Sequence, residues 1–311
     1  MAKKIPNIIK DFKSKTPTPV EGAKTFSYSQ LTTYLNCPKQ WQYKYLDKLG
    51  VQEPSIHLVF GTAFHETLQA WLDVVYNGSI KDANEMDVNS LLYNSMVKEY
   101  VKQKESSDKL FSSSEELQMF YLEGTYILDY IKRKRLTYFS SKQVHLAGIE
   151  TLLYRELRPN VYYRGYIDLV FYNEATEKWL ILDIKTSTTG WNKWQKADDT
   201  KIAQILLYKE YFAEQYGVSV DNVDVEYFIV KRHIPVEADF PAMQRRVQQF
   251  VPASGKIKRG KAISALNSFV KSVLEEGSEV IDKQHISTPS EKACRFCDFA
   301  KLGICKDAII K

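Results

Sequence analysis

The chain has 311 residues, of which 44% are hydrophobic and 26% are charged, and its formal net charge is +5. This length supports one large domain, or a core with an insertion, that needs neither disulfides nor metal merely to fold. No run of about 18 apolar residues occurs, and the basic start MAKKIPNIIKDFKSK lacks an apolar signal region, so we expect neither a membrane span nor a secretory signal.

The sequence of the first 46 residues predicts a flexible N-terminal segment, called the lead, followed by a helix. Residues 1–24 are basic and contain Pro and Thr, so we expect a flexible segment there. An aromatic-rich helix is predicted over 29–46, with Ser27 or Ser29 as its cap and a break at Pro38.

A second helix is predicted over 58–75, where Gly61 would allow another backbone to approach closely. Residues 76–142 are polar with helical spacing, which indicates a helical insertion. The insertion carries no obvious chemistry.

From about Val144 the hydrophobic pattern changes from helical spacing to the alternation of strands. The expected elements are strands over 146–157, 162–172 and 178–186, a turn at 173–177, a helix over 200–217 closed by Gly217, and a strand over 223–232. This order of elements predicts an α/β fold with a mixed central sheet flanked by helices. We expect it to form one domain over residues 25–311.

Two aspartates lie in otherwise apolar strands, and burying a carboxylate is costly without a functional reason. If the turn at 173–177 closes a hairpin, Asp168 and Asp183 fall opposite each other, and two converging carboxylates favour a divalent cation. Lys185 leaves the same strand face as Asp183 and can orient water or neutralise a phosphate. Alone, Asp183 and Lys185 would indicate a surface ion pair; Asp168 favours a phosphodiesterase site.

This constellation resembles the PD-(D/E)XK nuclease superfamily, and more narrowly its RecB-like branch, which includes CRISPR-associated RecB-like exonucleases and the exonuclease V type. Gly165-Tyr166-Ile167-Asp168 matches the G-x-x-D element of that branch, and Asp183-Ile184-Lys185 matches D-x-K. The resemblance implies a restriction-endonuclease-like sheet and Mg²⁺ or Mn²⁺ as cofactor.

Further site residues are implied by the same resemblance. His65 matches the G-x-x-x-H pattern of the branch, and His65, Asp168, Asp183 and the Ile184 carbonyl are implied as metal ligands. Gln204 and Tyr208 match Q-x-x-x-Y, one turn apart on one helix face, and would position the lysine or the DNA strand. Glu150, in the strand before the hairpin, ranks lower as an additional acid.

The four cysteines are unevenly placed, with one near the start and three near the end of the chain. Cys294 and Cys297 form a C-x2-C pair, which commonly holds zinc or an iron–sulfur cluster, and Cys305 and Cys37 complete a four-thiolate set. The spacing of the cysteines does not distinguish a tetrahedral zinc site from a [4Fe–4S] cluster. The iron–sulfur members of the branch have an S-x-L-x-x-Y-x-x-C-P-like segment, which residues 29–38 match closely, so the resemblance favours [4Fe–4S]. Their last gap is usually shorter than the seven residues here.

Candidate DNA contacts lie in two segments. Trp191 and Trp194 follow the D-x-K strand and would stack on bases, with Lys193 and Lys196 on phosphates, although loop anchoring explains the tryptophans equally well. Residues 241–270 are basic and free of Asp and Glu, which indicates either a solvated face or a phosphate-tracking surface; the candidate contacts there are Arg245, Arg246, Lys258 and Arg259.

The leading hypothesis is a metal-dependent DNA exonuclease acting on single strands or DNA ends, in a reducing cytoplasmic compartment. The alternative is a DNA-binding subunit of a recombination or CRISPR-adaptation complex in which cleavage is secondary. The iron–sulfur pattern argues against a restriction-type endonuclease. No G-x-x-x-x-G-K-[ST] motif is present, so an ATP-driven helicase or a recombination protein would have to be a separate partner.

Overall fold

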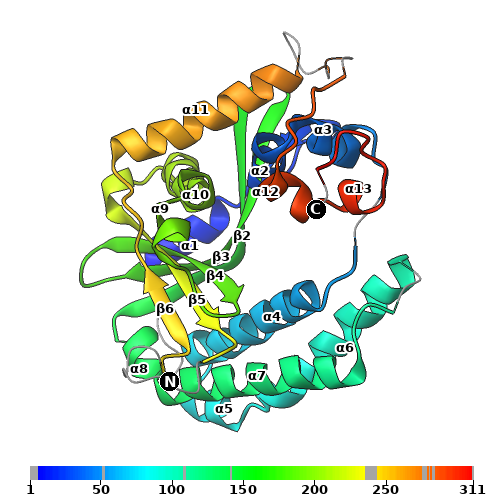
Figure 1. Ribbon diagram of the computed structural model, residues 1–311. Helices are drawn as coiled ribbons and strands as arrows, with labels where there is room; N and C mark the ends of the chain where they lie inside the picture. The colour runs from blue at the N-terminus through cyan, green and yellow to red at the C-terminus, as the bar shows by residue number, and fades with distance from the viewer. Residues whose placement is uncertain are drawn as a thin grey trace. The chain divides into compact units, whose positions relative to one another are not determined.

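The computed structural model describes residues 6–50, 53–107, 110–140, 142–234, 244–274, 279, 281 and 284–309. It has a mixed six-stranded sheet flanked by helices, as the sequence predicts (Figure 1). The chain divides into two compact units: Met1–Thr16, Pro54–Leu152 and Tyr166–Ser254 form the first, and Pro17–Glu53, Leu153–Gly165 and Gly255–Lys311 the second. The assignment of 25–311 to one domain stays a prediction. Residues 1–5 of the expected lead and 108, 109 and 141 of the expected insertion lie outside the described residues.

The first unit contains most of the sheet. Its helices are α1 (Asn7–Ser14), α4 (Ile56–Asn77), α5 (Ile80–Glu85), α6 (Val88–Ser107), α7 (Ser114–Arg133), α8 (Arg135–Tyr138), α9 (Lys193–Ala197) and α10 (Asp199–Tyr216), with a 3-10 turn η2 at Val220–Asn222. Its strands are β4 (Lys178–Ser187), β5 (Val223–Lys231), β6 (Val247–Phe250) and parts of β2 (Val144–Arg158) and β3 (Val161–Asn173).

The register of this sheet follows from its connections. Strands β3 and β4 form an antiparallel hairpin in which Leu169 lies opposite Leu182, so the predicted register is confirmed. Strands β4 and β5 are parallel and are joined through α10, the crossover that parallel strands require. The short strand β6 pairs antiparallel with β5 and was not predicted, because its four residues are too few to show a period.

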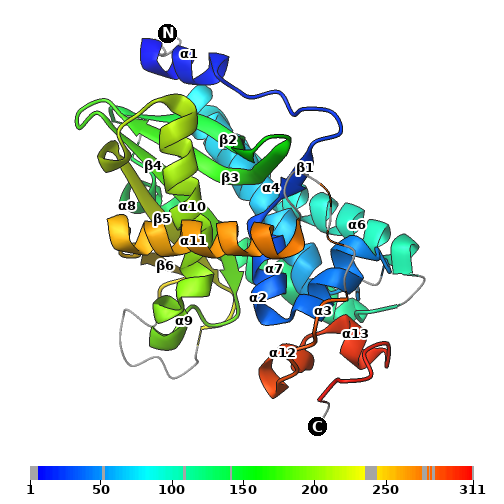
Figure 2. The ribbon, with the colours of Figure 1, turned by 90° about the horizontal axis from the view of Figure 1, so that it is seen from above.

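Helices cover both faces of the sheet (Figures 1 and 2). Phe64 and Leu68 of α4 share a core with Leu182 and Ile184 of β4. On the other face, Phe212 of α10 lies 5.5 Å from Trp179, between ring centroids. Because side chains alternate along a strand, Asp183 and Lys185 of β4 point towards the α10 face of the sheet.

Residues 7–14 differ from the flexible lead that the sequence suggested, because they form α1. Ile9 and Phe12 are only 2% and 5% exposed, and the Phe12 ring lies 4.5 Å from Tyr216 and 5.2 Å from Trp179. The helix therefore depends on packing against α10 and β4, which a short basic sequence does not reveal.

Two glycine predictions have different outcomes. Gly217 ends α10 in the left-handed region at φ +66°, as expected. Gly61 does not mark a close backbone approach: a Cβ there would meet the Thr186 hydroxyl at 3.5 Å, an ordinary contact.

The second unit contains the cysteines. Its elements are β1 (Lys24–Phe26), α2 (Tyr28–Asn36), α3 (Pro38–Trp41), a π-helical turn η1 (Gln42–Leu46), α11 (Lys256–Val273), α12 (Glu291–Arg295) and α13 (Asp298–Lys301). Ser27 caps α2 by accepting a hydrogen bond from the Gln30 amide, and Pro38 separates α2 from α3, as predicted. Trp41 and Tyr34 pack on Phe269 of α11 at 5.6 and 4.9 Å. Within the described part of the chain, no helix is both long and apolar enough to cross a membrane.

Candidate active site

The two aspartates meet where the β3–β4 ladder ends. Asp168 lies one residue beyond the last paired position of β3, and Asp183 lies at the same place on β4. The Asp168 carboxylate accepts a hydrogen bond from the Ile184 amide at 2.6 Å, a donor that would otherwise serve the ladder. Asp168 therefore inserts its side chain between the strands, beside Asp183, which is 1% exposed.

Lys185 connects this pair to α10. Its ammonium lies 2.7 Å from Asp183 Oδ2 in an ion pair and donates a hydrogen bond to Gln204 Oε1 at 2.9 Å. Gln204 in turn donates to the Tyr208 hydroxyl at 3.0 Å. The structure thus brings together four residues predicted from the sequence: Gln204 contacts Lys185 directly, and Tyr208 contacts Gln204.

His65 approaches from α4. Its Nδ1 lies 3.7 Å from Asp168 Oδ2. Burial, helped by the positive charge of Lys185, lowers the pKa of His65 to about 4, and a hydrogen bond with the Ile184 backbone offsets only part of this. At neutral pH the imidazole is uncharged, so this contact is not a salt bridge, and a neutral imidazole is the form that binds metals.

Burial is also the largest influence on the pKa values of the two aspartates. It raises the pKa of Asp168 well above its usual range; the Asp183 carboxylate raises it further, while Lys185 and the Ile184 amide oppose the shift. Burial raises the pKa of Asp183 against the effect of Lys185. For Lys185, burial alone would lower the pKa, but the two carboxylates outweigh it and raise the pKa. Negative charge in this site is therefore poorly compensated by one ammonium group.

Glu150 and Gln69 lie next to this group. Gln69 of α4 donates from Nε2 to Glu150 Oε1 at 2.6 Å, and the same nitrogen lies 3.4 Å from the Asp168 carbonyl. Glu150 adds a further negative charge that raises the pKa of Asp168. Gln69 was not predicted from the sequence, although its position four residues after His65 puts both side chains on one helix face.

The donor set fits a hard divalent cation in its chemistry. Carboxylate oxygens, a backbone carbonyl and a neutral imidazole are suitable ligands, and buried Asp183 Oδ2 has no partner with hydrogen-bond geometry, even though Lys185 is near. Among the described residues, no three His, Cys, Asp or Glu side chains form a complete metal group. The candidate ligands Asp168, Asp183 and His65 thus lie close together without forming a complete metal group, and Lys185 contacts Asp183.

All four cysteines belong to the second unit and are free thiols. Cys294 and Cys297 are buried in a small apolar cluster against which Cys305 packs, and the Cys297 amide donates to the Cys294 carbonyl at 3.1 Å. Burial raises the pKa of the Cys297 thiol, and the charges of Cys305 and Cys37 raise it further. Among the described residues, the cysteines do not form a complete metal group.

The aromatic candidates for DNA contact differ in exposure. Trp191 is 8% exposed, its ring lies 4.8 Å from Tyr227, and Gln248 bonds its backbone amide and carbonyl. Trp191 therefore anchors the loop and has little surface for a base. Trp194 is 72% exposed and lies in the short helix α9 next to Lys193, whose ammonium lies 4.8 Å from the indole ring.

The basic residues that were predicted to contact DNA lie in both units. In the first, Lys196 lies over Phe250 at 5.6 Å, Arg245 is exposed, and Arg246 donates to the Arg232 carbonyl and lies 5.8 Å from the Tyr126 ring. In the second, Lys258 and Arg259 are half-buried on α11. A role in binding DNA stays a prediction for each of them.

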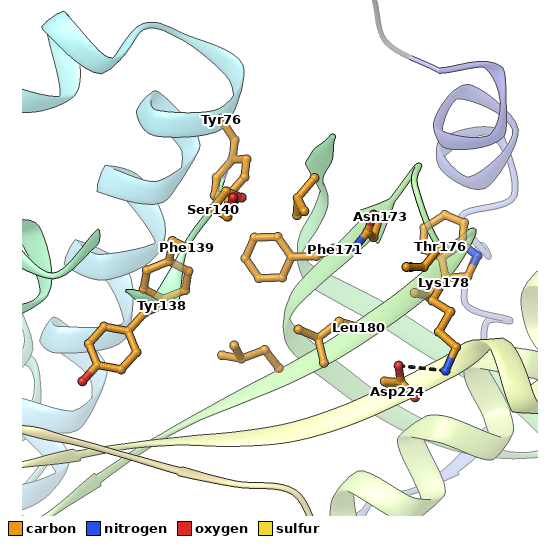
Figure 3. Close-up of a pocket in the computed structure, with 13 residues that line it drawn as sticks. Tyr76, Tyr138, Phe139, Ser140, Phe171, Asn173, Thr176, Lys178, Leu180 and Asp224 are labelled. Carbon is orange, nitrogen blue, oxygen red and sulfur yellow. Dashed lines mark hydrogen bonds and ion pairs between the residues drawn. The ribbon is translucent and has the colours of Figure 1, made fainter. Parts of the chain in front are cut away.

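A separate cavity of about 270 Å³ lies near the other end of β4 (Figure 3). Tyr76, Phe139 and Phe171 line it, and Lys178 and Asp224 form an ion pair of 3.3 Å at its edge. Its charged groups neutralise each other, and Asp168 and Asp183 are not among its lining residues, so it is not the catalytic site.

The family comparison decides the broader identity. The model of the PD-(D/E)XK nuclease superfamily matches residues 25–305. The chain belongs to this superfamily. Its members are nucleases that use Mg²⁺ or Mn²⁺ and act on DNA. The search of curated proteins found no match. The match begins where the sequence analysis placed the start of order, and it includes Asp168, Asp183 and Lys185.

Proposed function

We propose that this PD-(D/E)XK chain is a divalent-metal-dependent DNA exonuclease of the RecB-like type, acting on single strands or DNA ends. The observation that carries the proposal is a connected set of polar groups around the buried Asp183: Asp168 lies beside it, Lys185 forms an ion pair with it, and Gln204 accepts a hydrogen bond from Lys185. The neutral His65 beside Asp168 completes the donors that metal-assisted hydrolysis needs.

Each residue then has a defined task. His65, Asp168, Asp183 and the Ile184 carbonyl would hold Mg²⁺ or Mn²⁺, which lowers the pKa of bound water and polarises the phosphodiester. Lys185 orients the attacking water or stabilises charge that develops on the phosphate. Gln204, itself fixed by Tyr208, keeps the ammonium group in place.

Exonuclease action is supported by the G-x-x-x-H and Q-x-x-x-Y matches to the RecB-like branch and by the exposed Trp194 beside Lys193. An exposed indole with a neighbouring cation provides a stacking surface that tolerates any base and a contact for phosphate. The lack of an ATP-binding motif in the sequence is consistent with a separate helicase or recombination partner.

We further propose a [4Fe–4S] cluster with a structural role, bound by Cys37, Cys294, Cys297 and Cys305. The support is that the charges of Cys305 and Cys37 contribute to the raised pKa of Cys297, and that Cys294 and Cys297 lie in an apolar environment, which would shield an iron–sulfur cluster from water. Zinc is the less favoured occupant. A reducing compartment follows from this proposal, because the ligands must stay as thiolates.

The central test uses anaerobically purified protein and end-labelled linear DNA, single- and double-stranded, with Mg²⁺, Mn²⁺ or EDTA. Wild type should release nucleotides or short fragments only with metal, and Asp183→Asn should not. Asp224→Asn, which changes an exposed aspartate on the neighbouring strand, is the matched control and should cleave normally. Rapid cutting of circular single strands would contradict the exonuclease assignment. Metal-independent degradation, or full activity of Asp183→Asn, would contradict the nuclease site.

The cluster is tested on the same preparation. Iron in the elemental analysis, broad visible absorbance and their loss in Cys297→Ser are expected. Zinc without iron would replace the cluster by a structural zinc site, and absence of both metals would reject the four-cysteine centre.

A further inference from the structure

Strand β2 contains a local distortion at Glu150. This residue has φ +47°, in the left-handed region that non-glycine residues rarely adopt, although it lies within a strand. Two residues earlier, a Cβ on Gly148 would lie 2.2 Å from the Thr151 hydroxyl oxygen, so any other residue there would require the Thr151 side chain to move. Backbone strain of this kind persists when the surrounding contacts require it, and it often occurs at functional sites.

The contact made by the distorted segment is with Gln69. The Glu150 carboxylate accepts from Gln69 Nε2 at 2.6 Å, which fixes the direction of an amide group whose residue is only 6% exposed. With the amide held in this direction, the same nitrogen points to the Asp168 carbonyl at 3.4 Å. Asp168 lies just beyond the paired part of β3, where the β4 ladder no longer holds its backbone.

We propose that Gln69 is a positioning residue for Asp168, and that the distortion at Glu150 serves to hold Gln69 in the productive orientation. The proposal rests on the nuclease function above. It assigns Glu150 an indirect role: its carboxylate acts on the site through the Gln69 amide. Partners of this kind, which orient a metal ligand without touching the metal, typically change metal affinity about 10–100-fold when removed.

The test compares Mn²⁺ binding, followed by the EPR signal of the free ion, with the metal dependence of DNA cleavage. Gln69→Met keeps the length of the side chain but removes its donor. It should weaken Mn²⁺ binding about tenfold and raise the metal concentration for half-maximal cleavage equally, with an unchanged KM for DNA. Glu150→Gln keeps an acceptor opposite Gln69 and should weaken binding much less.

Gln103→Met is the matched control, because Gln103 is another buried glutamine of the same unit, 8% exposed, and it donates to Glu99 at 3.0 Å in the insertion. It should bind Mn²⁺ like wild type. Wild-type affinity in Gln69→Met, or an equal loss in Gln103→Met, would overturn the proposal. A strong loss in Glu150→Gln with none in Gln69→Met would instead make Glu150 a direct ligand. If wild type bound no Mn²⁺ at all, the proposed nuclease function would fail with it.

Discussion

Removing the ammonium group of Lys185 should destabilise the metal-free protein in a pH-dependent way. Asp183 is 1% exposed and Lys185 31% exposed, and their charged atoms are 2.7 Å apart. At an effective dielectric constant of about 20, that separation corresponds to roughly 6 kcal/mol of attraction. Part of this is offset, because Lys185 is partly solvated and Asp183 can take up a proton. We therefore expect Lys185→Met to cost about 3 kcal/mol at pH 8, at the lower end for a broken buried pair.

The pH dependence follows from the direction of the shift. Lys185 lowers the pKa of Asp183, so its removal raises a pKa that burial has already raised. A carboxyl group with a folded pKa above its unfolded value contributes most to stability at low pH, where it is protonated, and that contribution is lost as pH rises through the folded pKa. The difference between Lys185→Met and wild type should therefore shrink as pH falls from 8 towards 5.

Urea unfolding in EDTA at pH 5.5 and pH 8, followed by fluorescence, measures this difference. Lys178→Met is the matched control on the same strand: Lys178 and Asp224 are 3.3 Å apart but 45% and 53% exposed, so their pair contributes at most about 1 kcal/mol. A loss of stability in Lys185→Met that is equal at both pH values, or no larger than that of Lys178→Met, would refute the reasoning. With metal and DNA, the same variant should lose cleavage by at least about 100-fold.

Three further outcomes are expected. Mn²⁺ should bind more tightly as pH rises from 5.5 to 8, because burial and the nearby Asp183 raise the pKa of Asp168, and protons then compete with the metal for that carboxyl group as pH falls. Calorimetry in buffers of different ionisation enthalpy measures the affinity and the protons released on binding. Trp194→Ala should raise the KM for single-stranded DNA about tenfold with little change in stability. Trp191→Ala should instead lower the free energy of unfolding by about 3 kcal/mol. A KM effect confined to Trp191→Ala would reverse these roles. Cys297→Ser should lower the unfolding temperature together with the iron content, and unchanged melting would show that the cluster has no structural role.

The central hairpin could be predicted because its information is local. The turn at 173–177 sets the register, and the register puts Asp168 beside Asp183. The spacing of two between Asp183 and Lys185 sets their common face, and the spacing of four between Gln204 and Tyr208 sets theirs. These positions depend on the period of the element and not on its neighbours.

Other features depend on contacts that the sequence does not encode locally. Glu150 was predicted only as a lower-ranked additional acid, because the distortion in β2 interrupts the alternation from which a strand face is predicted. Gln69 was not predicted, because only its contact with Glu150 distinguishes it from other glutamines. Trp191 looked as available as Trp194, since only the packing of Trp191 on Tyr227 separates them. Helix α1 forms because Phe12 has a buried position against Trp179, which lies far away in the sequence.

The electrostatics of the site explain why a metal-free and a metal-bound state should differ in the use of Lys185. In the metal-free protein, one ammonium group faces both Asp168 and Asp183; burial raises the pKa of both acids, and the charge of Lys185 opposes this shift without cancelling it. A divalent cation would neutralise the two acids, and the attraction of Lys185 to Asp183 would then weaken. The ammonium group would still be held at Gln204, whose own orientation Tyr208 fixes. We therefore propose that Gln204 is a second anchor of Lys185, which would keep the ammonium group beside the phosphate once a metal ion neutralised the carboxylates.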